Sequence, residues 1–252
     1  MAQRHPIPRR DILRAAGLAA GVTAGAAAIG AATIGTATIG TAAFGDDSAA
    51  ASAASVKPSL RFDNAAFYAN GKFDAEKGKD AVLALCKYHG YPVFPGFREK
   101  LWVSDYGKGD FTNVGLAACF FVNNEEDRYM MLDIFLLPNQ MLPEHWHVKS
   151  GENPTKREGW LVRWGLSHIV GIGAPNLGKD VVVPKSHMGG KVTVEHETVA
   201  GPGTFVKLAK VESRHWQLAG PEGAIITEVA NVHTGPGVHH SDPDMDAFFR
   251  TQ

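Results

Sequence analysis

The chain has little cysteine, no excess of either charge and a modest share of aromatic residues. Its 252 residues include only two cysteines, which excludes a small disulfide-rich scaffold. A balance of 25 basic against 26 acidic residues leaves a net charge of −1, so there is no general nucleic-acid footprint. The composition also excludes a collagen and a coiled coil. The hydrophobic fraction of 44% argues against global disorder.

Charge is missing from a long stretch near the N-terminus. The 31 residues from Ala15 to Gly45 contain no Lys, Arg, Asp or Glu. The preceding Pro8-Arg9-Arg10-Asp11-Ile12-Leu13-Arg14 resembles the twin-arginine export signal, which is read by a receptor and is not an anchor. An uncharged run of this length could instead span a bilayer as an uncleaved anchor. Glycines that recur every five residues disfavour that helix, and a signal segment is therefore the preferred interpretation.

These features predict three parts of the chain: a signal segment at residues 1–45, an Ala/Ser-rich linker at 46–60, and a folded domain at 61–252. The expected route is export through the twin-arginine translocase to the periplasm or the cell exterior. Without residues 1–45, 21 basic and 25 acidic residues remain, and nucleic acid and anionic membrane become poor partners. Because twin-arginine cargo folds in the reducing cytosol, we expect Cys86 and Cys119 to be buried free thiols.

The folded domain reads as one helix followed by many short strands. Apolar residues at helical spacing predict a helix from Ala75 to Tyr88, which ends at His89-Gly90-Tyr91-Pro92. Two apolar runs separated by polar residues predict a buried hairpin of 114–122 with 129–137. Further strands are expected at 142–148, 158–164, 166–172, 191–198, 203–209, 213–218 and 224–230. This spacing is typical of a mainly β sandwich or barrel, here with an N-terminal helical extension.

Two short motifs place chemistry on expected strands. In His145-Trp146-His147 the two histidines are two residues apart, so they share one face of a strand and can converge on a metal ion. Lys156 and Glu158 share a face by the same rule, and such groups are costly to bury unless they are paired or ligated. The alternatives are ordinary surface histidines and a charged, solvated strand entrance.

A third prediction comes from counting residues on either side of an expected hairpin turn. If the chain reverses at Ala219-Gly220-Pro221-Glu222-Gly223, His215 lies directly opposite Glu228, with their Cβ atoms about 5 Å apart. Glu228 stands alone in an apolar strand, which makes it a candidate functional carboxylate. The alternative is an edge-strand glutamate that faces water.

Several stretches together resemble the cupins, and within them the D-lyxose isomerase family of sugar isomerases. They are Asp105-Tyr106-Gly107-Lys108-Gly109 with Asn113–Leu116, Pro143–His147, Lys156-Arg157-Glu158 with Arg163-Trp164-Gly165, and His215–Glu228, closed by Asp242-Pro243. The resemblance covers roughly residues 60–245. It implies a single cupin-type β-barrel, or jelly roll, and a metal-dependent aldose–ketose isomerase with a small-molecule sugar as substrate; the sequence leaves a homodimer open.

The resemblance also implies the metal ligands. One divalent ion, Mn²⁺ or Zn²⁺, would be held by His145, His147, Glu158 and His215. A rival for the glutamate is Glu152, which with Gly159 satisfies the spacing of the general cupin motif. Glu158 is preferred because Glu152 lies in an apparent turn.

The catalytic lysine and glutamate of the family correspond to Lys156 and Glu228. In an enediol mechanism Glu228 would be the base and Lys156 the proton donor or electrostatic partner. Asp105 matches a further family acid that could bind sugar hydroxyls, and its alternative role is turn formation.

His233, His239 and His240 are expected to be exposed loop histidines rather than a pocket rim. Rival functions are an exported cupin that only binds sugar or metal, and a different metal-cupin reaction such as oxygenation.

Overall fold

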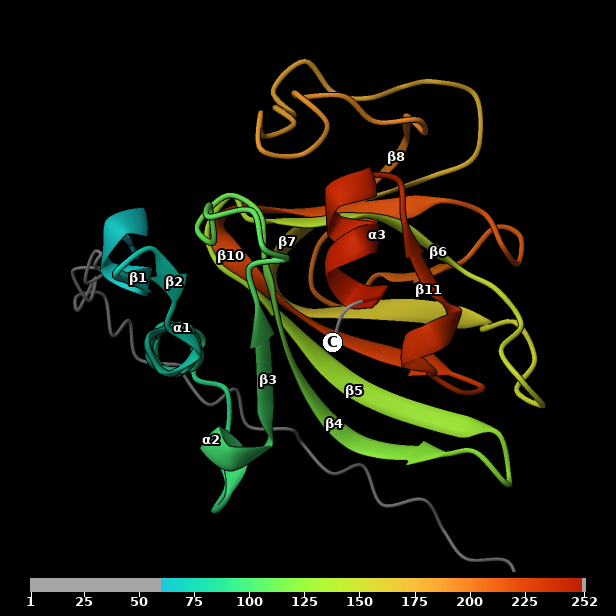
Figure 1. The fold of residues 1–252 in the computed structure, drawn as a ribbon, viewed down its shortest axis with the longest axis horizontal. Helices are drawn as coiled ribbons and strands as arrows, with labels where there is room; N and C mark the ends of the chain where they lie inside the picture. Colours follow the sequence, from blue (N-terminus) through green and yellow to red (C-terminus); the bar gives the residue numbers. More distant parts are fainter. Residues whose placement is uncertain (1–59, 251–252) are drawn as a thin grey trace, which may run out of the picture. The chain divides into compact units, whose positions relative to one another are not determined.

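Nine strands joined in one curled sheet form the centre of the computed structural model, which describes residues 60–250 (Figure 1). The expected signal segment and nearly all of the expected linker lie outside the described residues. Between residues 60 and 250 no helix has the length and apolar character needed to cross a membrane. In chain order the strands are β1 (Tyr68–Ala69), β2 (Lys72–Phe73), β3 (Leu101–Ser104), β4 (Leu116–Asn124), β5 (Tyr129–Leu136), β6 (Met141–His147), β7 (Glu158–Gly171), β8 (His196–Ala200), β9 (Phe205–Lys207), β10 (His215–Ala230) and β11 (Val238–His240). The helices are η1 (Asn64–Phe67), α1 (Ala75–His89), α2 (Phe97–Lys100), η2 (Gly235–Gly237) and α3 (Pro243–Arg250).

The sheet curls into a barrel-like shape, and β10 has different neighbours along its length. Its first part pairs with β6 and its second part with β5, while β7 pairs with both parts. The strand order is β11-β6-β10-β5-β4-β3, with β8 and β9 attached to β7 and β1 and β2 forming a separate ribbon. All pairings between these strands are antiparallel. The expected cupin-type barrel is confirmed.

The hairpin expected from residues 114–122 and 129–137 is confirmed as β4 and β5. Cys119 pairs with Asp133 in its register, and a bulge lies between Phe120 and Val122. Successive residues of β4 alternate between the barrel interior and the outer face, as a strand requires. The two later expected strands are shorter than predicted: β8 begins at His196 and β9 spans only three residues.

The expected hairpin between residues 213 and 230 is wrong. β10 is one continuous strand of 16 residues, and His215 pairs with His145 rather than with Glu228. Glu228 instead lies between Leu132 of β5 and Trp160 of β7. The two segments expected at 158–164 and 166–172 are likewise the single strand β7.

The physical reason is a shared bend in β7 and β10 (Figure 1). Ala219 pairs with Ser167 but Ala224 pairs with Gly165, so four residues of β10 oppose one residue of β7. Such an insertion bends a strand without ending it. Gly165 and Gly223 have φ values of 71° and 75°, which glycine adopts readily. The bend therefore divides β10 into two arms, with His215 on the first and Glu228 on the second, and both residues are buried.

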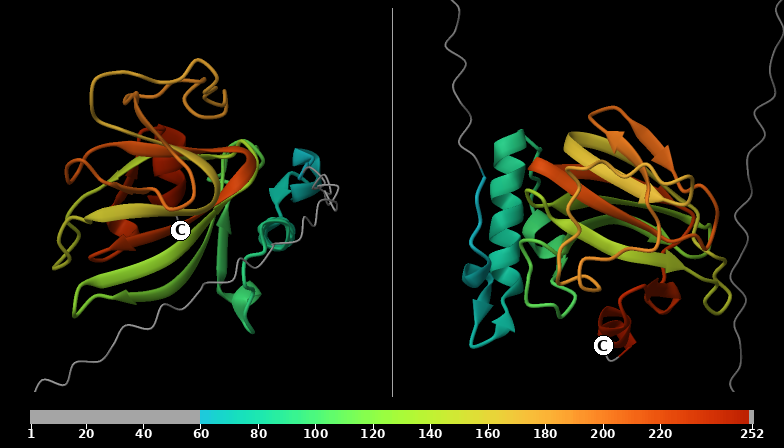
Figure 2. Two further views of the ribbon diagram at one scale, coloured as in Figure 1. Left: turned by 180° about the vertical axis from the view of Figure 1, so that it is seen from behind. Right: turned by 90° about the horizontal axis from the view of Figure 1, so that it is seen from above.

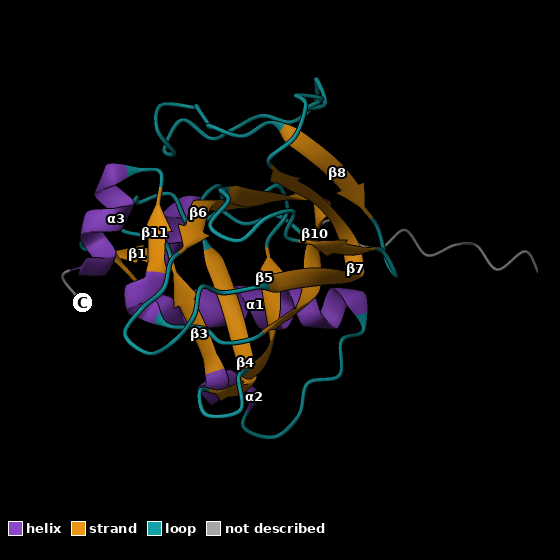
Figure 3. Cartoon of the chain, turned by 90° about the vertical axis from the view of Figure 1, so that its right-hand side faces the viewer, coloured by secondary structure: helices purple, strands orange, loops and turns teal. Residues whose placement is uncertain are grey.

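Helix α1 packs on the outer face of the sheet (Figures 2 and 3). Asp74 caps it by accepting hydrogen bonds from the backbone N–H groups of Glu76 and Lys77, and Gly90 ends it with φ 71°. The buried cluster under the helix contains Val82, Leu85, Cys86, Ala117, Cys119, Phe135 and Ile225. Both cysteines are free and buried, as expected.

Candidate active site

Three histidines converge inside the barrel. His145 and His147 point inward from β6, and His215 lies beside His145 in the β6–β10 pairing. The ring centroid of His145 is 4.2 Å from that of His215 and 5.1 Å from that of His147. One ring nitrogen from each of the three lies within 4.8 Å of the others. This buried cluster could bind a metal ion.

The backbone fixes how the imidazoles are turned. Nδ1 of His145 lies 2.8 Å from the carbonyl oxygen of Pro143, and Nδ1 of His215 lies 3.0 Å from that of Ser213. Because a carbonyl only accepts, both Nδ1 atoms carry the proton and each Nε2 keeps a free lone pair. Burial lowers the pKa of all three histidines, which holds them neutral.

Glu158 completes this group from the first residue of β7. Its Oε1 lies 3.3 Å from Nε2 of His147 and 3.3 Å from Nε2 of His215. Burial alone would raise the pKa of Glu158, but Lys156 and the histidines outweigh it and hold that pKa well below its usual range. Glu152, the rival, is exposed in the turn before β7. The geometry therefore favours Glu158 as the carboxylate of the cluster.

Lys156 lies between two buried carboxylates. Its Nζ is 2.7 Å from Oε2 of Glu158 and 2.5 Å from Oε1 of Glu228. The other oxygen of Glu228 accepts a 3.2 Å hydrogen bond from the indole N–H of Trp160. The sequence placed Lys156 and Glu158 on one face correctly. It could not foresee that the bent ribbon would bring Glu228 to the same lysine.

The two carboxylates have opposite electrostatic character. Burial raises the pKa of Glu228 to about 6, with Lys156 only partly opposing it. Burial would lower the pKa of Lys156, but Glu158 and Glu228 outweigh that and raise it. Lys156 therefore stays protonated between the strongly acidic carboxyl group of Glu158 and the more basic one of Glu228. Pairs of carboxyl groups with separated pKa values are typical of acid–base catalysis.

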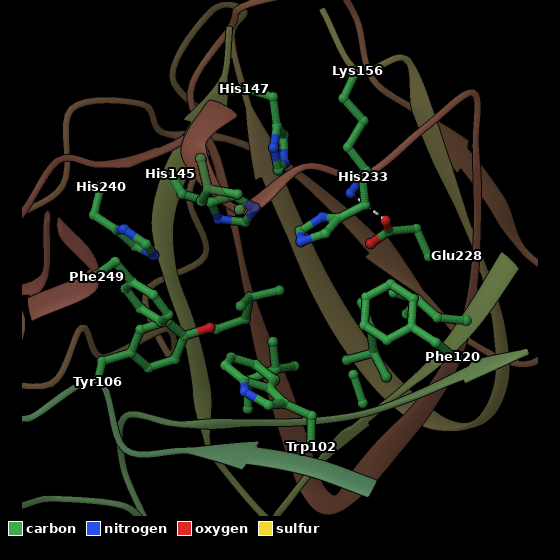
Figure 4. Close-up of a pocket in the computed structure, with 17 residues that line it drawn as sticks. Trp102, Tyr106, Phe120, His145, His147, Lys156, Glu228, His233, His240 and Phe249 are labelled. Atoms are coloured by element: carbon green, nitrogen blue, oxygen red, sulfur yellow. Dashed lines mark hydrogen bonds and ion pairs between the residues drawn. The ribbon is translucent and has the colours of Figure 1, made fainter. Parts of the chain in front are cut away.

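The cluster opens into a cavity of about 430 Å³ in the barrel (Figure 4). Its lining includes His145, His147, Lys156 and Glu228. Trp102 is 40% exposed and also lines the cavity, so the cavity reaches solvent beside that residue. A volume of this size is ordinary for a small-molecule pocket.

Sequence reasoning missed part of the lining. His233 and His240, expected in exposed loops, both line the cavity, and His240 is buried. His240 pairs with His145 across β11 and β6, whereas His239 points the other way and stacks on Trp146. The alternation of side chains in 238–240 could have separated the two histidines. Nothing local in the sequence indicated that this segment pairs with β6.

Asp105 does not reach the cavity. Its carboxylate accepts hydrogen bonds from the backbone N–H groups of Gly107 and Gly109 and from the hydroxyl group of Tyr68. Asp105 is absent from the cavity lining, which instead includes its neighbour Tyr106. These contacts match turn formation, the alternative role of Asp105, and its sugar-binding role stays a prediction.

The comparisons with known proteins point to one family. No protein-family model matches the chain. It is 31% identical over 170 residues to a D-lyxose ketol-isomerase of Cohnella laeviribosi, covering 68% of this chain and 91% of that protein. It is also 31% identical to a D-lyxose/D-mannose isomerase of Thermosediminibacter oceani, covering 68% of this chain and 87% of that protein. The structure of L-ribose isomerase from Cellulomonas parahominis shares the fold, with a TM-score of 0.51, 10% identity and coverage of 68% of this chain and 93% of that one. On these likenesses the chain belongs to the D-lyxose ketol-isomerase family.

Proposed function

We propose that this protein is a metal-dependent isomerase that interconverts D-lyxose or a related aldose with its ketose. Membership of the family makes it an aldose–ketose isomerase. The observation that carries the rest is the Lys156–Glu228 pair, buried in a cavity beside three imidazoles and Glu158. A protein that only binds sugar or metal has no need of a basic carboxylate at this place.

The residues present fit a divalent metal ion. Nε2 of His147, Nε2 of His215 and Oε1 of Glu158 are buried without a hydrogen-bond partner and face one another. Such unpartnered lone pairs are costly unless a cation binds them. Three imidazoles and a carboxylate suit Zn²⁺ or Mn²⁺. A bound divalent ion would supply Lewis acidity that polarises the sugar carbonyl group.

Glu228 is proposed as the base that moves the proton between C1 and C2. Its pKa of about 6 leaves it ionised near neutral pH and still able to accept a proton. The contacts with Lys156 and Trp160 hold both carboxylate oxygens in place. Lys156 remains protonated and stabilises negative charge that develops on the substrate oxygen during transfer.

The proposal is tested with protein loaded with Mn²⁺ or Zn²⁺ and incubated with D-lyxose and D-mannose in D₂O. Proton NMR should show loss of the C2 proton signal together with appearance of the ketose. A metal-free sample is the control and should show neither change. If the loaded protein exchanges no C2 proton of these or other aldoses, the isomerase proposal is wrong.

A further inference from the structure

One face of the active-site cavity, formed by β4 and β5, is apolar. Strands β4 and β5 contribute Leu116, Ala118, Phe120, Leu132 and Ile134 to the lining, here called the apolar wall. These residues alternate along each strand and pair across it: Phe120 with Leu132, and Ala118 with Ile134. No side chain of the apolar wall carries a hydrogen-bonding group.

The backbone behind the apolar wall is also unavailable. β5 pairs with β4 on one side and with β10 on the other, so its backbone N–H and C=O groups are used in hydrogen bonds between strands. β4 is paired with β3 over residues 116–119 and with β5 along most of its length. A hydroxyl group pressed against the apolar wall would therefore lose its hydrogen bonds to water without replacement.

Polar groups occupy the opposite side of the cavity. Figure 4 shows His145, His147, Lys156 and Glu228 on one side and Phe120 and Trp102 on the other, with the hydroxyl group of Tyr106 pointing into the cavity at the left of the view. Leu132 is the cross-strand neighbour of Glu228, so the apolar wall begins one strand away from the proposed base. Neighbouring strands lie about 4.8 Å apart, which is roughly the reach of four carbon–carbon bonds. A sugar with C2 beside Glu228 can thus bring its far end against the apolar wall.

We infer that the preferred substrates are aldoses whose end remote from the carbonyl group is apolar, such as 6-deoxyhexoses. This inference rests on the proposed isomerase function and adds the chemical class of the substrate. A methyl group at C6 needs no hydrogen bond and gains contact with Leu132 and Phe120, whereas a hydroxyl group there is left without a partner.

The matched pair that tests it is D-mannose and 6-deoxy-D-mannose, which differ only by the C6 hydroxyl group. We expect kcat/KM of the metal-loaded enzyme to be about 10-fold to 100-fold higher for the deoxy sugar, the usual range for discrimination at an apolar pocket. Binding is followed separately by NMR saturation transfer, in which the C6 methyl group should receive the most saturation. Equal kcat/KM values, or a preference for D-mannose, would overturn the inference.

Variants test whether the preference for the deoxy sugar arises at the apolar wall. Phe120→Tyr and Ala118→Ser each add one hydroxyl group there and should reduce the preference for the deoxy sugar several-fold. The matched control is Phe121→Tyr, because Phe121 is the next residue of β4 and is 38% exposed on the outer face. An unchanged preference in both folded variants would also contradict the inference.

The outcomes separate the two proposals. Turnover of D-lyxose or D-mannose without preference for the deoxy sugar overturns the substrate class and leaves the isomerase function standing. Absence of turnover and of C2 proton exchange for all three sugars overturns the isomerase function, and the inference falls with it.

Discussion

Glu228 is held at both oxygens, by Lys156 and by Trp160, and this leads to a sharp expectation for Glu228→Gln. The amide keeps the shape of the side chain but cannot accept a proton. We expect kcat to fall about 10²–10⁴-fold, with KM changed less, because the lost interaction belongs to the transition state. Steady-state kinetics with metal analysis measure this. Glu222→Gln, an exposed position of the same strand, is the control. Full activity of Glu228→Gln would assign the base to another residue.

The pKa of Glu228 predicts in which direction the activity changes with pH. Burial raises that pKa to about 6, and a base must be ionised to accept a proton. Activity is therefore present above pH 6 and lost as the pH falls through it, about tenfold for each further unit. The measurement is kcat/KM from pH 4.5 to 8, with metal content determined at each pH. In Glu228→Gln, the residual activity should no longer fall as the pH drops below 6.

The choice between Glu158 and Glu152 predicts how metal binding responds to substitution. Glu158 lies against two histidine nitrogens, whereas Glu152 is exposed in a turn. We expect Glu158→Gln, like the double variant His145→Ala/His147→Ala, to weaken metal binding at least about tenfold. Glu152→Gln should bind like the wild type. Equal metal content in the wild type and the double variant would exclude this site.

How far the sequence predicted the site depends on whether the geometry is local. His145 with His147, and Lys156 with Glu158, were placed correctly because side-chain alternation within one strand is a local property. For Asp105 the sequence left two roles open, since turn formers and sugar-binding acids look alike in sequence. His240 was missed because its position depends on the pairing of β11 with β6, some 90 residues away in the chain.

At the scale of elements, the bend in β7 and β10 is the feature that sequence reasoning misread. A Gly-Pro-Glu-Gly segment between two apolar runs is typical of a hairpin turn, and the arithmetic for His215 and Glu228 assumed a reversal. Here the same residues form a bulge, and β10 continues along its partner β7. Both residues still reach the interior, because the bend turns one arm of the ribbon toward the other. Turn chemistry alone cannot distinguish these outcomes, since only the partner strand decides them.

The bend predicts a large cost for Gly165→Ala. Gly165 has φ 71°, and a Cβ atom there would lie 2.0 Å from the carbonyl oxygen of Gly223, which cannot move without disturbing β10. We expect the free energy of unfolding to fall by about 3 kcal/mol or more. Gly203→Ala is the matched control, because Gly203 also has a positive φ but no neighbour within 4 Å. Its expected loss is about 1–2 kcal/mol. Urea titrations measure both, and equal losses would show that the close approach is unimportant.

For the whole molecule, the proposed active site and the proposed export signal lie in different parts of the sequence. Residues 60–250 contain every group of the proposed active site, and their two cysteines are free and buried. A domain of this kind needs no oxidising compartment to fold. That property suits a protein which folds in the cytosol before export, as the twin arginines at positions 9 and 10 predict.

Conservative substitution of those arginines tests the export proposal. A receptor reads the arginine pair as an address rather than as positive charge alone, so Arg9→Lys/Arg10→Lys should keep the protein in the cytoplasm. Arg4→Lys, in the same segment but outside the pair, should export normally. Cell fractionation with isomerase activity as the readout follows the folded protein, and retained molecules should be active when metal is supplied. A strain without the twin-arginine translocase should reproduce the retention with the unchanged chain. Normal export in that strain would show that the uncharged run after Arg14 uses another route.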